Sequence, residues 1–265
     1  MSLAYTDTAA GPTLVLLHAF PLDRQMWRPQ LAALAGTARV IAPDLPGFGK
    51  SPLPPEGWTV DSAADDVAAL LDTLGQSGRV VVGGLSMGGY VAMAFARRYP
   101  ERLAGLILAD TRAEPDDDTA KANREKLIVT AKSQGAAPVV DAMLPKLLGE
   151  ETRAKRPGVA DAVRAMGAKQ AGEGVAAALA ALRDRPDAGP GLDGLTAPLL
   201  VLVGEHDAVT PPTLAAAMAG RVYGSELVTV SGAGHLSNLE NPDEFNAAVA
   251  RFLAERTPAV KPATA

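Results

Sequence analysis

Short, almost wholly apolar runs alternate with longer amphipathic segments along most of the chain. The runs are rich in Val, Leu and Ile, which is typical of strands buried on both faces of a parallel sheet. They predict strands at residues 13–18, 38–44, 79–85, 103–110, 198–204 and 225–232. The segments between them predict helices, most clearly at residues 59–75, 87–100 and 241–258. This alternation indicates an α/β fold in which a mostly parallel, twisted sheet has helices on both faces.

The alternation breaks once, between residues 111 and 196. This stretch is rich in Ala and in charged residues, and it predicts several helices, for example at residues 119–135 and 158–170. An all-helical insertion between two strands is most simply a cap over one edge of the sheet. We therefore expect a core formed by residues 1–110 and 197–258 and a helical cap formed by residues 111–196. The tail at residues 259–265 is expected to be disordered.

Composition narrows the chemistry that this fold can carry. The chain has 265 residues, which suits a single α/β unit with an insertion. It has no cysteine, which excludes disulfides, thiol catalysis and Cys-based zinc sites. A net charge of −5 and the lack of a Lys/Arg stripe argue against a nucleic-acid partner. No membrane span and no secretory signal are visible, so we expect a cytoplasmic protein without a membrane partner.

The stretch DLPGFGKSP, residues 44–52, ends like a phosphate-binding P-loop. That motif reads G-x-x-x-x-G-K-[ST] and lies between a strand and a helix. Counting back from Gly49, the position of the first Gly is occupied by Asp44. Pro52 and Pro54 also oppose a helix directly after the motif. The stretch is therefore interpreted as a Gly-containing loop with Lys50 facing solvent, and a nucleotide hydrolase is disfavoured.

The strongest chemical signal is the G-x-S-x-G motif Gly84-Leu85-Ser86-Met87-Gly88. A predicted strand precedes it and a predicted helix follows it. A strand-to-helix turn this sharp holds the central residue in a strained conformation and raises its Oγ above the sheet edge. Glycines two positions before and after the serine leave room for the neighbouring backbone. This context favours Ser86 as a nucleophile over a plain Gly-rich packing turn.

A serine hydroxyl needs a base to take its proton, and the chain has three histidines. His235 follows the last predicted strand, and Asp207 follows the strand before it. The order Ser86, Asp207, His235 is that of one large fold, and the carboxyl ends of parallel strands meet at one edge of the sheet. Asp110 also ends a predicted strand and is the alternative acid, since position alone does not separate the two carboxylates. His206, beside the predicted acid, is interpreted as structural.

An oxyanion hole needs backbone N–H groups aimed at the developing negative charge. The residue after the nucleophile, Met87, is expected to supply one N–H. The loop after the first long strand, HAFPLDRQMW, is expected to supply the other from Phe20, with His18 shaping the turn. No H-E-x-x-H motif and no cluster of histidines suggests a metal, and no cofactor is expected.

Taken together, HAFPLDRQMW, PDLPGFGKS, GGLSMGGYVAM, GEHDAVTPP and GAGHLSNLENP resemble, in this order, the α/β-hydrolase superfamily over nearly the whole chain. The stretch from Gly83 to Asp117 is similar to bacterial carboxylesterases related to 3-oxoadipate enol-lactonases and cofactor-free haloperoxidases. The resemblance implies a Ser86–His235–Asp207 triad, an oxyanion hole from Phe20 and Met87, and a helical cap. Two features depart from the family pattern. Ala19 replaces the usual Gly after the histidine, and the N-terminal hairpin is abbreviated.

The resemblance implies a serine carboxylesterase that hydrolyses small, short- to medium-chain esters through an acyl-enzyme. An enol-lactonase or a cofactor-free haloperoxidase or perhydrolase uses the same residues and is the alternative. Branches of the superfamily with an aspartate nucleophile are disfavoured by Ser86. A ligand receptor without turnover on the same fold is a further alternative. The expected partner is a small-molecule ester, and the expected assembly is a monomer or small homo-oligomer.

Overall fold

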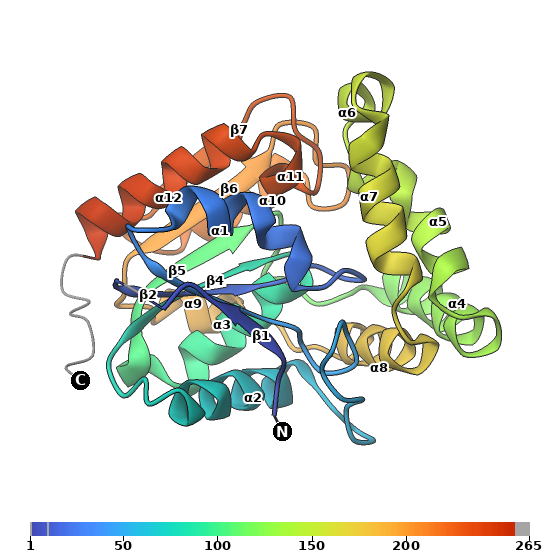
Figure 1. The fold of residues 1–265 in the computed structure, drawn as a ribbon, viewed down its shortest axis with the longest axis horizontal. Coiled ribbons are helices and arrows are strands. Elements are labelled where there is room, and N and C mark those ends of the chain that lie inside the picture. Colours follow the sequence, from blue (N-terminus) through green and yellow to red (C-terminus); the bar gives the residue numbers. More distant parts are fainter. Residues whose placement is uncertain (1, 10, 258–265) are drawn as a thin grey trace.

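The computed structural model describes residues 2–9 and 11–257. Within them, seven strands form one sheet in the order β1-β3-β2-β4-β5-β6-β7 (Figure 1). Strand β1 pairs antiparallel with β3, and all other neighbours are parallel. The six strands predicted from the apolar runs are confirmed as β2 to β7. The bounds are β1 Tyr5–Asp7, β2 Thr13–Leu17, β3 Arg39–Pro43, β4 Val80–Leu85, β5 Leu103–Ala109, β6 Leu199–Gly204 and β7 Glu226–Val230.

The central strands are apolar throughout because both faces of the sheet are covered. Side chains alternate between the faces along a strand. In β2, Val15 and Leu17 belong to one buried cluster, and Leu14 and Leu16 belong to the other. The first cluster includes residues of α2 (Val60–Thr73), α3 (Met87–Arg98), α9 (Gly189–Asp193) and α10 (Pro212–Gly220). The second includes residues of α1 (Arg28–Leu34) and α12 (Pro242–Arg256).

The predicted helices at residues 59–75 and 87–100 are confirmed as α2 and α3, and the third corresponds to α12. Thr59 caps α2 by accepting a hydrogen bond from the Ser62 N–H, and Asn241 caps α12 in the same way from Glu244. The amphipathic pattern did not predict α1, α10 or three short elements, η1 (Arg24–Trp27), η2 (Pro100–Arg102) and α11 (Ser237–Glu240). The expected disordered tail lies outside the described residues.

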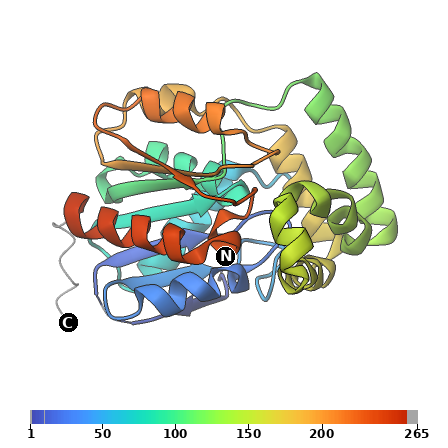
Figure 2. The same cartoon turned by 90° about the horizontal axis from the view of Figure 1, so that it is seen from above.

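Between β5 and β6 all regular elements are helical. In Figures 1 and 2, α4 to α8 gather at one end of the sheet, and these five are called the cap helices below. They are α4 (Asp118–Gln134), α5 (Ala136–Leu147), α6 (Glu150–Lys155), α7 (Pro157–Ala168) and α8 (Gly172–Arg183). The Gly149 N–H, between α5 and α6, donates to Glu240 in α11, after β7 (2.8 Å). The cap helices therefore lie at the carboxyl ends of the parallel strands.

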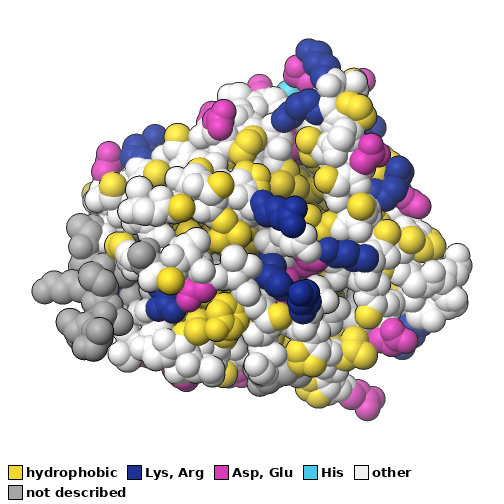
Figure 3. Space-filling view, viewed as in Figure 1, with side chains coloured by type: hydrophobic (Ala, Val, Ile, Leu, Met, Phe, Trp, Pro, Cys, Tyr) yellow, Lys and Arg dark blue, Asp and Glu magenta, His cyan; other side chains and the backbone are white. Residues whose placement is uncertain are grey.

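A groove of about 580 Å³ separates α7 from the start of α1. Its lining is mostly apolar and includes Val159, Met166 and Leu239, with Arg28 and Lys169 among the lining residues. On the face drawn in Figure 3, hydrophobic side chains show at the junction between the cap helices and the rest of the molecule, and Lys and Arg lie close by. Buried residues of the cap helices belong to both core clusters, so the cap packs on the core and the groove lies beside α7.

Candidate active site

Ser86 lies in the sharp turn between β4 and α3 and has an unusual backbone conformation. Its φ is 54° and its ψ is −111°, a region that costs a non-glycine residue about 1–3 kcal/mol. Surrounding hydrogen bonds hold this conformation. The Ser86 N–H donates to the Ala109 carbonyl (2.9 Å), and the Thr111 hydroxyl donates to the Ser86 carbonyl (2.9 Å). The predicted strained strand-to-helix turn is therefore present.

The two glycines of the motif are required by close backbone contacts. A Cβ on Gly84 would lie 2.0 Å from the Gly88 carbonyl oxygen. A Cβ on Gly88 would lie 2.0 Å from the carbonyl oxygen of Leu17 in β2. Atoms at that distance overlap, so neither position accepts a side chain without movement of the backbone. This contact allows α3 to begin directly above the sheet and to present Ser86 at its edge.

His235 lies between Ser86 and Asp207 and contacts both. Its Nε2 is 2.9 Å from Ser86 Oγ, and its Nδ1 is 2.8 Å from Asp207 Oδ2. Both His235 and Asp207 are buried, whereas Ser86 is partly exposed. An ionised carboxylate only accepts hydrogen bonds, so Nδ1 carries the proton and Nε2 is left to accept from the serine hydroxyl. Three residues that follow three different strands are thus joined in one chain of hydrogen bonds.

Four donors surround the Asp207 carboxylate. Oδ1 accepts from the N–H groups of Val209 (2.8 Å) and Thr210 (2.9 Å). Oδ2 accepts from the Thr210 hydroxyl (2.6 Å) as well as from His235. Burial opposes ionisation of Asp207, but attraction to His235 and these hydrogen bonds outweigh it, and the pKa lies below its ordinary value. Asp207 is therefore a carboxylate at neutral pH.

Asp110, the alternative acid, faces other partners. Its Oδ1 accepts from the Gly204 N–H (2.8 Å), and its Oδ2 contacts the Ser237 N–H (3.3 Å) and the Ser237 hydroxyl. Within the described residues no hydrogen bond joins Asp110 to His235. Complete burial and the negative charge of Asp207 raise the pKa of Asp110 well above its ordinary value. Of the two candidate acids, only Asp207 contacts the imidazole.

The two predicted oxyanion donors lie in the expected elements. Met87 is the first residue of α3, and the first N–H groups of a helix have no partner within it. Phe20 lies in the turn after β2, and its N–H makes no hydrogen bond within residues 2–9 and 11–257. Ala19, where the family pattern has Gly, packs in the buried cluster of α1 and α12, whereas Phe20 packs in the other cluster. The Ala19 methyl group is thus accommodated in the core.

The other two histidines lie outside this arrangement. His18 is completely buried, and its Nε2 accepts from the Leu45 N–H (2.9 Å). Burial is the largest effect on His18 and lowers its pKa, so the ring is neutral and shapes the loop after β2. His206 is exposed beside Glu205, with its Nε2 3.9 Å from that carboxylate. The expectation that His206 does not act as the base therefore agrees with its position.

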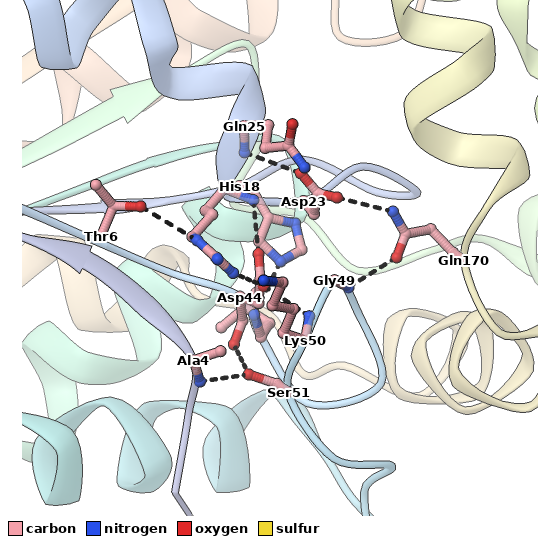
Figure 4. Close-up of polar contacts among 12 residues, drawn as sticks. Ala4, Thr6, His18, Asp23, Gln25, Asp44, Gly49, Lys50, Ser51 and Gln170 are labelled. Atoms are coloured by element: carbon pink, nitrogen blue, oxygen red, sulfur yellow. Dashed lines mark hydrogen bonds and ion pairs between the residues drawn. The ribbon is translucent and has the colours of Figure 1, made fainter.

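The loop that resembles a P-loop is closed around a carboxylate (Figure 4). Asp44 accepts from the backbone N–H groups of Arg24 (2.9 Å) and Lys50 (2.8 Å), and it pairs with the Arg24 guanidinium. Gly49 has a φ of +57°, and a Cβ there would lie 2.1 Å from Asp44 Oδ2. Residues 51–59 contain no helix, and Lys50 is exposed. The Lys50 N–H of the loop donates to Asp44 and no helix follows directly, so the loop lacks the features of a P-loop and the nucleotide interpretation is excluded on structural grounds.

The same view shows how the cap reaches this loop (Figure 4). Gln170, between α7 and α8, accepts from the Gly49 N–H (2.8 Å) and donates to Asp23 in the loop after β2 (3.2 Å). Lys169 forms an ion pair with Asp23 (2.9 Å). Gln170 and Asp23 are buried. We call these four residues, Asp23, Gly49, Lys169 and Gln170, the cap latch. It connects the cap to two loops at the carboxyl edge of the sheet.

Comparisons with known proteins match this architecture. A family profile described as alpha/beta hydrolase fold matches residues 12–242. The chain belongs to the α/β-hydrolase fold family. It is similar to an esterase from Thermogutta terrifontis, with a TM-score of 0.94 and 44% identity over 96% of this chain and 94% of that one. It is also similar to the enol-lactonase from Burkholderia xenovorans LB400, with a TM-score of 0.88 and 31% identity over 96% of each chain. The 3-oxoadipate enol-lactonase 2 of Acinetobacter baylyi is 29% identical over 249 residues, 94% of this chain and 91% of that protein.

The predicted resemblance to this α/β-hydrolase superfamily and to its esterase and enol-lactonase members is therefore confirmed. Within residues 2–9 and 11–257, no three or more His, Asp or Glu side chains are grouped so that they could hold a metal ion. Across the same part of the chain, every helix is too short or too polar to cross a membrane.

Two residues of this α/β-hydrolase site were not singled out from the sequence. Thr210 donates its hydroxyl to Asp207, and Thr111 donates its hydroxyl to the Ser86 carbonyl. Thr210 carries a weak signal, because a hydroxyl residue three positions after a loop aspartate is typical of a local side-chain turn. Thr111 has no such signal, since its partner is 25 residues away. The arrangement as a whole combines an oriented base, a partly exposed hydroxyl and backbone donors, which together suit acyl transfer.

Proposed function

We propose that the protein is a serine carboxylesterase that hydrolyses small, short- to medium-chain carboxylic esters through an acyl-enzyme. The observation that carries the proposal is the unbroken chain of hydrogen bonds from Asp207 through His235 to Ser86, at 2.8 and 2.9 Å. A general base within hydrogen-bond reach of the hydroxyl is the first geometric requirement for a serine nucleophile. The 44% identity to an esterase over nearly the whole chain supports the same reaction class.

In the proposed reaction, Ser86 Oγ attacks the ester carbonyl while its proton passes to His235 Nε2. Asp207 keeps the Nδ1 proton in place and stabilises the imidazolium that forms. The imidazolium then donates its proton to the leaving alcohol, and the acyl group remains on Ser86. A water molecule, deprotonated by the same imidazole, attacks the acyl-enzyme. The imidazolium then returns this proton to Ser86 Oγ as the bond to the acyl group breaks, and the carboxylic acid is released.

The tetrahedral intermediates carry a negative oxygen that needs donors. We assign this role to the backbone N–H groups of Phe20 and Met87. The N-terminal end of α3 also carries partial positive charge, which favours an anion beside Ser86. Loss of a single donor from an oxyanion hole typically costs about 10²–10³-fold in kcat. Because both donors belong to the backbone, side-chain substitution at these positions should alter the acyl pocket more than the oxyanion hole.

We infer that residues 111–196 act as a cap that sets the size of the acyl pocket. The cap latch and the Gly149–Glu240 hydrogen bond attach it to loops after β2, β3 and β7, at the carboxyl edge of the sheet where Ser86 also lies. A cap held at several points limits the room above Ser86, which favours small esters.

Hydrolysis of a lactone is the second candidate, because two of the named relatives are enol-lactonases. A lactone is a cyclic ester, so attack, proton transfer and deacylation use the same residues. The only difference is that the leaving alcohol stays attached to the acyl group. A perhydrolase reaction would replace water by hydrogen peroxide in the second half of the cycle.

The proposal is tested with p-nitrophenyl acetate, butyrate and octanoate, using two matched histidine variants. His235→Ala should lose activity by at least about 10⁴-fold, as should Ser86→Ala, whereas the exposed His206→Ala should keep it. An organophosphonate should label the wild type once and Ser86→Ala not at all. Full activity in Ser86→Ala would refute the nucleophile. Parallel assays measure hydrolysis of an enol-lactone and perhydrolysis with hydrogen peroxide, and a rate above that of ester hydrolysis in either assay would favour that alternative. Tight retention of a ligand without turnover would indicate a receptor.

A further inference from the structure

Asp110 is a completely buried carboxyl that the proposed reaction does not use. It directly follows β5 and has a positive φ of 44°. Its N–H donates to the Leu202 carbonyl in β6 (2.9 Å), and its Oδ1 accepts from the Gly204 N–H at the end of β6 (2.8 Å). Its Oδ2 contacts the N–H and the hydroxyl of Ser237, after β7. One side chain therefore joins the carboxyl ends of two strands to the segment after a third.

The partners of Asp110 stand beside the two residues that orient the nucleophile. Gly204 precedes Asp207 by three positions, and Ser237 follows His235 by two. The two loops also share a backbone hydrogen bond from the His206 N–H to the Ala233 carbonyl (2.8 Å), on the other side of His235. Without Asp110, the segment after the imidazole would lose its polar attachment to the end of β6. A small rotation of that segment would change both distances made by His235.

We propose that Asp110 is a positioning residue, which holds the loop of His235 against the end of β6 so that the imidazole faces Asp207 and Ser86 at once. The inference rests on the proposed function, since it assigns Asp110 a part in orienting the proposed base. It also accounts for a strained backbone at a residue that, within the described part of the chain, makes no hydrogen bond to Ser86.

The protonation of Asp110 fits this role. Burial and the charge of Asp207 both favour the neutral form. Its Oδ1 accepts from the Gly204 N–H, and its Oδ2 accepts from the Ser237 hydroxyl. In its neutral form Asp110 places no second negative charge beside Asp207, so the imidazolium stays paired with one carboxylate. A carboxamide has the same shape, but its NH₂ group would face the Ser237 N–H, so Asn cannot reproduce all three contacts.

The test uses Asp110→Asn, Ser237→Ala and the double variant, with Asp116→Asn as a control. Asp116 is another buried aspartate, which lies just before α4 and pairs with Arg124 in α4 and with Arg185 after α8. We expect each of the first two variants to lower kcat for p-nitrophenyl butyrate about 10–100-fold with KM within about twofold, because small misplacements of a base cost about that much. The double variant should be no slower than the slower single variant, because both substitutions remove the same link between Asp110 and Ser237. Asp116→Asn should lower the thermal midpoint without this loss of kcat.

A spectroscopic readout separates this inference from the proposed function. The proton NMR signal of the His235 Nδ1–H should shift or broaden in Asp110→Asn and in Ser237→Ala, and stay in place in Asp116→Asn. This measurement needs no substrate, so it remains decisive if Ser86-dependent ester hydrolysis is not found. A lower thermal midpoint with unchanged kcat and unchanged imidazole signal would overturn the inference, as would additive losses in the double variant. A loss near 10⁴-fold in Asp110→Asn alone would also overturn it and make Asp110 the acid. If Asp110→Asn does not fold, Ser237→Ala, which removes only a hydroxyl, tests the inference by the same two readouts.

Discussion

Replacing Asp207 by Asn should reverse the tautomer of His235. All four neighbours of the Asp207 carboxylate are donors, and two of them are backbone N–H groups that cannot turn. The amide oxygen of an Asn must therefore take the place of Oδ1, facing Val209 and Thr210. Its NH₂ group then faces His235 Nδ1, which has to become an acceptor. The imidazole proton moves to Nε2, and the nitrogen that faces Ser86 can no longer accept a proton.

The expected loss of kcat is that of a site whose side chains keep their positions but whose histidine can no longer accept the serine proton. For a triad with the wrong tautomer the cost in kcat is about 10⁴-fold. At 1.36 kcal/mol for each factor of ten, this corresponds to about 5.4 kcal/mol of transition-state stabilisation. KM should change by less than about twofold, because Asp207 is buried behind the imidazole and does not contact the ester.

The assay is steady-state hydrolysis of p-nitrophenyl butyrate at pH 8, with thermal unfolding of the variant measured beside it. Asp110→Asn serves as the comparison, because it changes the other buried carboxyl at the same edge of the sheet and is expected to lose no more than about 100-fold. Retention of more than a tenth of the wild-type kcat in folded Asp207→Asn would show that Asp207 does not set the tautomer of the base.

Three further outcomes are expected. Gly88→Ala places a Cβ 2.0 Å from a carbonyl oxygen of β2 and should lower the free energy of unfolding in urea by about 3 kcal/mol or more. The control is Gly194→Ala, whose added Cβ would have no neighbouring atom within 4 Å, and it should change the free energy of unfolding by less than about 1 kcal/mol. Gln170→Ala removes the hydrogen bonds that attach the cap to Gly49 and to the buried Asp23 carboxylate, which costs about 1–3 kcal/mol, and limited proteolysis should cut the cap faster than in the wild type. Burial opposes ionisation of Asp116, but the neighbouring arginines outweigh burial and lower its pKa from 3.8. The carboxylate therefore stabilises the folded state above pH 3.8, and this stabilisation is lost as the pH falls through the lower pKa of the folded state. In acid unfolding, the free energy of unfolding of Asp116→Asn should lack this part of the decline.

The strands were predictable because their sequences leave few choices. Runs such as residues 80–85 and 199–204 are apolar at every position, and a short run of this kind is typical of a strand covered on both faces. Helix α1 was not predicted, because it is short, begins at Arg28-Pro29 and directly follows a stretch that was interpreted as a loop. The bounds of the cap helices depend on how they pack against one another, which an Ala-rich sequence does not determine.

The candidate site was predictable to the same degree. Ser86 and His235 carry local signals, a G-x-S-x-G motif and a histidine among small residues after the last strand. Asp110 and Asp207 carry the same local signal, because each follows a buried strand. Their difference arises from the direction of the side chain at each strand end, which depends on contacts with Gly204, Ser237 and Thr210 formed only in the folded chain.

The proposed function depends above all on acylation of Ser86 during turnover. This step can be observed by rapid mixing of the wild-type protein with p-nitrophenyl butyrate, acid quenching within milliseconds and peptide mapping by mass spectrometry. We expect a butyryl group on the peptide that contains Ser86, and its absence from the same peptide of Ser86→Ala. Turnover with no acyl adduct on that peptide, or with the adduct on another residue, would mean that Ser86 is not the nucleophile.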